Sequence, residues 1–233
     1  MNTQSIALVT GANRGIGFEV SHQLGALGYM VLLGCRNTTR GLAAQEALRA
    51  DGIKAQQIDL DVSIPASIEA AVAQVERDYP HLDVLVNNAA IHYDTWQRVT
   101  DANMDIVAEA IEANTLGPWR LSVALLSMLR RSKAPRIVNV SSEGGSIASM
   151  SGGTPAYSLS KAGLNAITRM MAHELEREGI LVNAICPGWT KTDMGGSGGR
   201  PVADGAKGII WAVTLDRSGP SGGFFRDGQP LPW

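Results

Sequence analysis

A phenol and an ammonium group lie four residues apart in the segment PAYSLSKAGLNA, as Tyr157 and Lys161. Residues at this spacing share one face of a helix, so the two side chains are expected to be neighbours. A nearby cation lowers the pKa of a phenol from about 10 toward neutrality, which would let Tyr157 donate or accept a proton. Hydride transfer from a nicotinamide to a carbonyl creates an alkoxide, and we predict that Tyr157 protonates it. Taken alone, such a pair is more often an ordinary exposed pair on a helix.

Other polar residues would complete such a site. A hydroxyl at the end of the apolar run PRIVNVSS, on Ser141 or Ser142, would hydrogen-bond the substrate oxygen. Asn114 lies beside a break in a long helical stretch and would hold a water molecule in a proton relay with Lys161. Lys161 would also bond the ribose next to the nicotinamide.

A glycine-rich turn, TGANRGIG, follows the first apolar run of the chain. Its three glycines, Gly11, Gly15 and Gly17, allow positive φ angles and a close approach of the backbone to a pyrophosphate. The helix that follows would add free N–H groups and the positive end of its dipole. The spacing differs from the commonest dinucleotide-binding fingerprint, and the alternative is a tight turn without a ligand.

The end of the second apolar run bears on the choice of cofactor. An acid there would bond the ribose 2′-hydroxyl of NAD and repel a 2′-phosphate. This chain instead has Arg36, in the segment LLGCRN, and a second guanidinium, Arg14, within the glycine turn. Because two guanidinium groups can clamp a phosphate through bidentate bonds, we predict NADP(H) rather than NAD(H). The alternative is that Arg36 is a solvated loop residue.

The elements that would position these residues alternate along the chain. Short, continuously apolar runs are typical of strands buried on both faces of a sheet, and helical patterns separate them. The expected strands are 5–11, 29–36, 54–62, 82–90, 134–142 and 180–188, with one more near 222–233. The expected helices are 17–28, 38–52, 63–80 capped by Ser63, 104–132 interrupted at NTLGP, 155–179 and a short last one. This order predicts a single-domain, doubly wound α/β fold of the Rossmann type, with a parallel sheet of about seven strands over residues 1–233.

Composition excludes several other classes of protein. Twenty basic and 22 acidic residues give a formal net charge of −2, which does not favour nucleic acid or an anionic membrane as partner. The two cysteines, Cys35 and Cys186, are isolated and indicate neither a metal site nor a disulfide framework. No signal peptide and no run near the ~20 apolar residues of a membrane span are present, so we expect a soluble, cytoplasmic protein.

Several motifs in the chain resemble the short-chain dehydrogenase/reductase family. They are TGANRGIG, DV at 61–62, NNAA at 87–90, Asn114, IVNVSS at 137–142, YSLSK at 157–161 and PGWTKT at 187–192. The motifs occur in the family's order and cover nearly the whole chain, so together they are far more specific than any one of them. The arginines near the cofactor and the ending GGFFRDGQPLPW resemble the NADPH-preferring carbonyl reductases of the family.

The resemblance implies a role for each polar residue of the site. Tyr157 would be the general acid/base and Lys161 its electrostatic partner. Asn114 would hold a water molecule. Ser142 would donate to the substrate oxygen, and it is preferred to Ser141 because the family's catalytic serine tends to be the last of the pair.

The resemblance also implies the contacts of the cofactor. Residues 61–62 would lie at the adenine and 87–90 along the adenosine, although Asn87 could instead mainly tie strands together. The turn at 187–188 would meet the nicotinamide, with Thr190 near the carboxamide and Thr192 near the phosphates. The predicted cofactor-binding residues are Gly11, Asn13, Arg14, Gly15, Ile16, Gly17, Arg36, Asp61, Val62, Asn88, Ala89, Ala90, Tyr157, Lys161, Pro187, Gly188, Thr190 and Thr192.

The substrate side is expected to be open and apolar. A glycine-rich lid, about 190–207, suggests a mobile mouth, and Trp96, Tyr93, Met150, Trp189 and Met194 flank it. Substrate contacts are predicted from Ser142, Tyr157, Trp189 and Met194, and hydrophobic or aromatic ketones and aldehydes are the expected substrates. Ordinary packing is the alternative role of these apolar side chains.

An oligomer is also expected. Monomeric carbonyl reductases of the family carry a long insertion before the catalytic tyrosine, whereas here only residues 143–156 separate it from Ser142. Apolar faces of the helices near 104–131 and 156–178 would therefore be free to pair across a two-fold axis, in a homodimer or homotetramer.

The leading interpretation is an NADPH-dependent carbonyl reductase or alcohol dehydrogenase. One alternative is an NAD-linked hydroxysteroid, sugar or polyol dehydrogenase, which Arg36 without an acid disfavours. The other is a dinucleotide sensor without catalysis. It is disfavoured because a sensor needs the glycine turn but not Ser142, Tyr157, Lys161 and Asn114.

Overall fold

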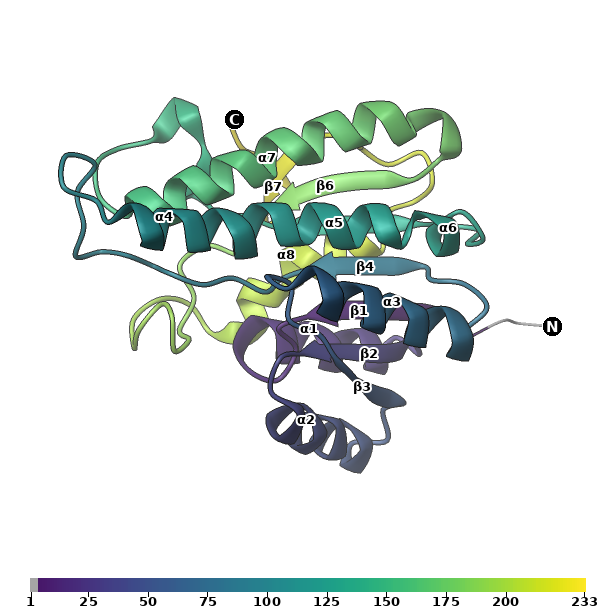
Figure 1. Cartoon of the computed structure of the whole chain (residues 1–233). Helices are drawn as coiled ribbons and strands as arrows, with labels where there is room; N and C mark the ends of the chain where they lie inside the picture. Colours follow the sequence, from purple (N-terminus) through teal and green to yellow (C-terminus); the bar gives the residue numbers. More distant parts are fainter. Residues whose placement is uncertain (1–3) are drawn as a thin grey trace.

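A twisted sheet with helices on both faces forms the protein, and the computed structural model describes residues 4–233 (Figure 1). The strand order is β3-β2-β1-β4-β5-β6-β7-β8, and every neighbouring pair is parallel except β7 and β8. The strands are β1 (Ile6–Thr10), β2 (Met30–Cys35), β3 (Ala55–Asp59), β4 (Val84–Asn87), β5 (Arg136–Val140), β6 (Leu181–Ile185), β7 (Phe224–Arg226) and β8 (Gln229–Pro230). The fold class predicted from the sequence is confirmed, with a two-residue antiparallel strand added at the edge.

The helices follow the predicted alternation. They are α1 (Gly15–Ala26), α2 (Thr38–Ala50), α3 (Pro65–Asp78), α4 (Met104–Ile111), α5 (Gly117–Ala124), α6 (Leu126–Leu129), α7 (Pro155–Leu175) and α8 (Val202–Val213). The predicted interruption at NTLGP is a π-helical turn, Glu112–Leu116, between α4 and α5. The predicted cap of α3 was wrong: Ile64 precedes the helix without a side-chain cap, and Ser63 donates its hydroxyl to Asp61.

Two apolar cores, one on each face of the sheet, hold these layers together. Along β1, Leu8 packs with the core beneath α3, α5 and α7, whereas Val9 packs with the core beneath α1, α2 and α8. Every residue of β1 is therefore buried, because successive side chains of a strand point to opposite faces. This explains why central strands such as β1 and β2 are apolar almost throughout.

The strand order places the functional segments at one edge of the sheet. The chain moves from β1 outward to β3 and then returns to place β4 on the other side of β1. Ligands of open α/β sheets bind in the crevice that such a switch creates at the carboxyl ends of the strands. The glycine turn, Arg36, residues 88–90, the two serines and Pro187 all follow the carboxyl ends of their strands. Within residues 4–233, no helix is both long enough and apolar enough to cross a bilayer.

Candidate active site

The glycine turn between β1 and α1 is shaped by close backbone contacts. Gly11 and Gly15 have φ angles of +64° and +55°, in the left-handed region that favours glycine. A Cβ atom on Gly17 would lie 2.4 Å from the carbonyl oxygen of Gly11 and 2.5 Å from the side-chain nitrogen, Nδ2, of Asn88. Arg14 precedes α1 in extended conformation and forms no side-chain cap. The amino end of α1 can therefore offer its N–H groups to an anion.

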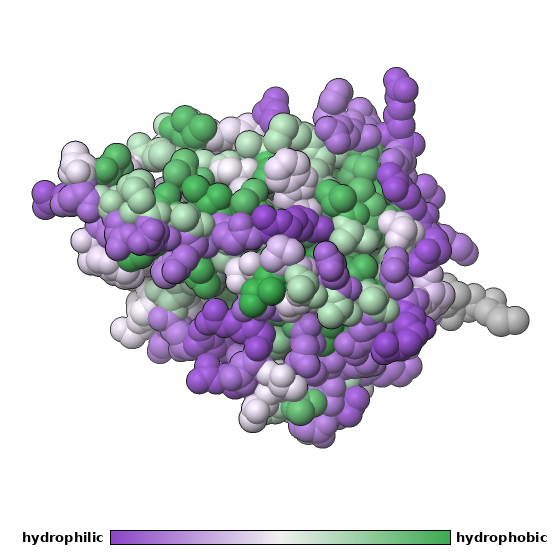
Figure 2. Space-filling model, in the orientation of Figure 1, coloured by the Kyte–Doolittle hydropathy of each residue, from purple (hydrophilic) through white to green (hydrophobic). Residues whose placement is uncertain are grey.

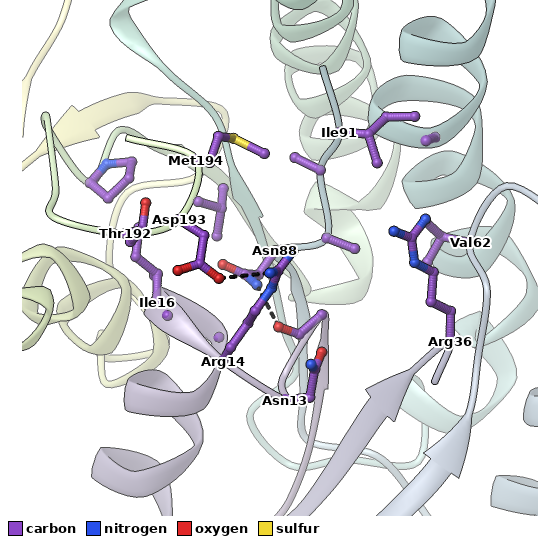
Figure 3. A pocket seen from close by; sticks show the side chains of 18 of the residues that line it. Asn13, Arg14, Ile16, Arg36, Val62, Asn88, Ile91, Thr192, Asp193 and Met194 are labelled. Atoms are coloured by element: carbon purple, nitrogen blue, oxygen red, sulfur yellow. Dashed lines mark hydrogen bonds and ion pairs between the residues drawn. The ribbon is translucent and has the colours of Figure 1, made fainter. Parts of the chain in front are cut away.

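A cavity of about 470 Å³ lies over this turn. Most of the predicted cofactor-binding residues line it, from the glycine turn, the end of β2, the segment after β3, the end of β4 and α7 (Figure 3). The predicted residues on its wall are Gly11, Asn13, Arg14, Gly15, Ile16, Gly17, Arg36, Asp61, Val62, Asn88, Ala89, Ala90, Tyr157, Lys161, Pro187 and Thr192. Gly188 and Thr190 are absent from this wall and line a neighbouring cavity instead.

Sequence reasoning missed several residues of the same wall. Ile91, Lys191 and Asp193 continue segments in which a motif residue had been identified, so adjacency in the sequence was the available signal.

Ser141 lines this cavity, but its buried hydroxyl donates to Asn165 at 2.6 Å. That bond commits Ser141 to a structural contact.

The two arginines that the sequence places near the cofactor enter the cavity from different sides. Arg36 points in from the end of β2 beside Val62, whereas Arg14 lies near the lid (Figure 3). Arg14 forms an exposed ion pair with Asp193, Nη1 to Oδ2 at 2.7 Å. Arg36 makes no ion pair or side-chain hydrogen bond with any described residue, which leaves its guanidinium free for an anionic group.

Tyr157 and Lys161 lie on the first turns of α7, as their spacing predicts. The ammonium nitrogen of Lys161 is 5.5 Å from the centroid of the Tyr157 ring and donates to the carbonyl oxygen of Val140 at 2.7 Å. Ser142 and Tyr157 line the same wall of a neighbouring cavity, and the Ser142 side chain lies near enough to lower the pKa of the phenol. Three of the four predicted catalytic side chains thus meet at the ends of β5 and α7.

The pKa of Tyr157 differs from the expectation for a phenol beside a cation. Burial raises the pKa of Tyr157 above its ordinary value, and the nearby Ser142 side chain opposes this only in part. Burial also lowers the pKa of Lys161, from 10.5 to about 8. The sequence predicted a lowered pKa for Tyr157, and this prediction was wrong. Desolvation of the phenol raises its pKa by more than the neighbouring groups lower it.

Asn114 lies in the π-helical turn and is fully buried. Its Oδ1 accepts from the backbone N–H of Ile91 at 2.8 Å, and its Nδ2 donates to the carbonyl of Ile91 and to Ser160 Oγ, both at 3.0 Å. Both N–H groups of the amide are therefore in use. In this structure Asn114 ties the segment after β4 to α7, a role that the water-holding prediction did not include.

A second cavity, of about 640 Å³, adjoins the first on the side of the lid. Ser142 and the predicted substrate residues Trp189 and Met194 line it, together with Tyr93 and Met150. Tyr157 belongs to both walls, so its phenol stands where the two cavities meet. Trp96 is absent from both walls and is 68% exposed, which removes it from the predicted mouth.

The glycine-rich lid segment is folded rather than open. Isolated bridges join Thr190 to Arg200 and Thr192 to Gly196. The indole nitrogen of Trp189 donates to the carbonyl of Gly195 at 2.9 Å, and a Cβ atom on Gly198 would lie 2.6 Å from the indole ring. The glycines are therefore partly explained by close packing against Trp189.

Comparisons with known proteins place this site in a family. The family model described as short chain dehydrogenase matches residues 5–201. The chain is 33% identical to (+)-neomenthol dehydrogenase of Arabidopsis thaliana, over 96% of each chain. It is 32% identical to carbonyl reductase (NADPH) 3 of Rattus norvegicus, over 98% of each. The crystal structure of NADPH-bound carbonyl reductase from chicken fatty liver superposes with a TM-score of 0.89 at 31% identity, covering 99% of this chain and 94% of that one.

The protein therefore belongs to the short-chain dehydrogenase/reductase family and is an oxidoreductase of that family. Its cofactor is a nicotinamide dinucleotide. The alignments with the two relatives run over 286 and 277 residues, although this chain has 233, so both relatives carry insertions that it lacks.

Proposed function

We propose that the protein is an NADP(H)-dependent carbonyl reductase or alcohol dehydrogenase that acts on small, largely apolar ketones, aldehydes or alcohols. The observation that carries this proposal is the position of Tyr157, which stands between the cofactor-side cavity and the second cavity, near Ser142. A group at that junction can reach the reacting oxygen of a substrate while the substrate faces the cofactor.

The residues of the first cavity fit a dinucleotide. The contact of Gly17 with Gly11 leaves no room for a side chain, and the uncapped amino end of α1 suits a pyrophosphate. At the far side Arg36 offers a guanidinium that pairs with no residue of the described chain, where an acid would favour NAD. When bound, the reduced nicotinamide supplies a hydride to the carbonyl carbon of the substrate.

The side chains of the site then manage the proton and the substrate oxygen. Ser142 donates a hydrogen bond to that oxygen and orients it toward Tyr157. Tyr157 donates its phenolic proton as negative charge develops on the oxygen. Lys161, while protonated, stabilises the phenolate that is left behind. Asn114 holds the segment that forms the wall beside Lys161.

The apolar side chains of the second cavity support the substrate class. Tyr93, Met150, Trp189 and Met194 are each between 41% and 67% exposed and line the second cavity. Such a mouth favours hydrophobic carbonyl compounds over charged acids and suits a broad substrate range.

The direct test is to compare oxidation of NADPH and NADH with a panel of aromatic and aliphatic ketones and aldehydes, followed by the absorbance of the reduced nicotinamide. We expect turnover of several carbonyls with NADPH. Tight cofactor binding without turnover of any of them would favour the dinucleotide-sensor alternative.

The role of Arg36 is tested by Arg36→Asp. Because the new carboxylate would repel a 2′-phosphate and bond a 2′-hydroxyl, the ratio of kcat/KM for NADPH to that for NADH should fall at least ~10-fold. Arg40→Asp, on the exposed side of α2, is the matched control for the added charge. An unchanged ratio in the Arg36 variant would place the 2′-phosphate elsewhere.

We further propose that the protein acts in the cytoplasm as a homodimer or homotetramer, and that residues 1–233 are one catalytic domain with a lid at about 190–207. The oligomer is supported by exposed apolar side chains on α5 and α7, among them Trp119 and Met170, at 44% and 52%. The lid is supported by Met194, which lies on the walls of both cavities.

A further inference from the structure

The first turn of α7 carries Tyr157 and has no cap of its own. Pro155 is its first residue and has no N–H, so the first free donors are the backbone N–H groups of Ala156 and Tyr157. Thr154 precedes the helix with a φ of +47°, and its hydroxyl bonds to Ser158 rather than to the backbone. The donors must therefore be satisfied from elsewhere.

Asp94, more than 60 positions earlier in the chain, satisfies both of them. Its Oδ2 accepts from the N–H of Ala156 and its Oδ1 from the N–H of Tyr157, each at 3.0 Å. The amide of Gln97 donates a further hydrogen bond to Oδ2 at 2.9 Å. In Figure 1 the segment between β4 and α4, which contains Asp94, runs past the amino end of α7.

The carboxylate of Asp94 is buried and has no cationic side chain as partner among the described residues. A buried charge of this kind is costly unless hydrogen bonds and a favourable dipole compensate it. Burial opposes ionisation of Asp94, but the hydrogen bonds from Tyr157, Ala156 and Gln97 hold its pKa below the ordinary value. The positive end of α7 adds to this compensation.

The same segment is fixed to the site at its other points. Asn114 binds both backbone groups of Ile91, and Gln97 accepts from the N–H of Asn103, the residue before α4. Tyr93 lies edge-on against the ring of Tyr157, with the ring centroids 5.2 Å apart. The segment 91–103 therefore contacts Tyr157 in two places. Tyr93 packs against the ring of Tyr157, and Asp94 accepts a hydrogen bond from its backbone N–H.

We propose that Asp94 is a positioning residue, which caps α7 from the segment after β4 and so holds the phenol of Tyr157 against Ser142 at the junction of the two cavities. This inference rests on the proposed function for its catalytic consequence. Asp94 does not touch the reacting atoms. It acts through the backbone of the residue that does, so its loss should change the chemical step more than cofactor binding.

The variants are Asp94→Ala, which removes both acceptors, and Asp94→Asn, which keeps the shape and one acceptor oxygen. The matched control is Asp83→Ala. Asp83 is a largely buried carboxylate before β4 that accepts from the backbone N–H of Ile6 at 2.8 Å, at the opposite edge of the sheet. Its removal also costs stability, but at a distance from Tyr157.

We expect kcat for carbonyl reduction to fall about 10²-fold in Asp94→Ala, since a misplaced reacting group can cost that much. Asp94→Asn should lie between this variant and the wild type. The dissociation constant of NADPH, measured by fluorescence, should be unchanged in both, and Asp83→Ala should keep the wild-type kcat at a temperature where it is folded. Wild-type kcat in Asp94→Ala, or an equal loss in Asp83→Ala, would overturn the proposal.

Two readouts do not depend on turnover. Hydrogen exchange should show that the amides of Ala156 and Tyr157 both lose protection in Asp94→Ala and keep it in Asp83→Ala. The phenol pKa of Tyr157, read as the ultraviolet difference between each variant and the same variant with Tyr157→Phe, should fall toward its ordinary value in Asp94→Ala only. If the wild type reduces no carbonyl, the proposed function fails, and these two readouts decide on Asp94: unchanged protection or an unchanged phenol pKa overturns its positioning role.

Discussion

At the scale of single residues, the proposed function depends most on Tyr157. Replacing it with Phe would remove the proposed proton donor, while the ring could still pack against Tyr93. We expect at least a ~10²-fold loss of kcat, because general acid catalysis contributes that much, with little change in NADPH affinity. Steady-state kinetics and fluorescence titration measure the two quantities. Tyr79→Phe, on a phenol that bonds to Gln56 far from the cavities, is the control, and a near-normal rate in Tyr157→Phe would remove that residue from the role.

We expect Lys161 to make the proposed reaction sensitive to pH. Burial lowers its pKa from 10.5 to about 8, so the ammonium is charged below that pH and loses its proton above it. If the charge assists catalysis, kcat/KM for NADPH should fall as the pH rises through about 8, since this parameter reports groups of the free enzyme. Lys161→Arg keeps its charge throughout, and its profile should lose this alkaline limb even if its maximum is lower. The same limb in the Arg variant would assign it to another group.

Functional residues that lie close together in the sequence were predictable, because the local backbone geometry sets their relative positions. The glycines of the turn and the Tyr157–Lys161 pair follow from backbone sterics and helix periodicity alone. The pKa of Tyr157 could not be predicted in this way, because it depends on the burial that several distant segments create. The capping role of Asp94 could not be predicted for a related reason. A capping residue normally comes directly before its helix, whereas Asp94 lies in the distant segment between β4 and α4.

Elements contribute contacts that single motifs do not show, and the ion pair between the lid and the glycine turn is one of them. Asp193 holds Arg14 across the cavity, with both side chains largely exposed. An exposed pair is worth only about 0.2–1 kcal/mol, but it occupies a guanidinium that we propose binds a cofactor phosphate. Asp193→Asn should therefore tighten NADPH binding by up to about 5-fold, with a weaker effect at high salt.

Fluorescence titrations with NADPH at low and high ionic strength measure this effect. Asp204→Asn, which breaks another exposed ion pair, with Lys207 on α8, is the matched control and should leave the dissociation constant unchanged. Weaker NADPH binding in Asp193→Asn would mean that the carboxylate orients Arg14 for the cofactor rather than competing for it.

The elements themselves were largely predictable because parallel strands buried on both faces must be apolar throughout. Two strands are exceptions: β3, AQQID, carries three polar residues and is only partly buried, and the two residues of β8 are exposed. The break at NTLGP was visible as a Gly-Pro pair, but its π-helical form was not. That form places the buried amide of Asn114 against Ile91, a contact that only the folded chain reveals.

At the scale of the whole molecule, apolar side chains remain exposed on the helices beside the site. Trp119 and Val123 on α5, and Leu159 and Met170 on α7, are between 44% and 53% exposed, and apolar patches are visible over these helices (Figure 2). A stable interface removes about 1,200–2,000 Å² from water, and two neighbouring helices on each subunit can supply such an area. We therefore expect a mass in light scattering that is a multiple of the 24.7 kDa chain.

The same surface can be tested by substitution. Trp119→Glu should shift the mass toward the monomer, because a charge at the centre of an apolar interface is left without a partner. Leu27→Glu is the matched control: Leu27 is 55% exposed at the carboxyl end of α1, on the other face of the sheet, and its variant should keep the wild-type mass. A wild-type mass near 24.7 kDa would instead show that α5 and α7 remain in contact with solvent, and their apolar residues would then need another explanation.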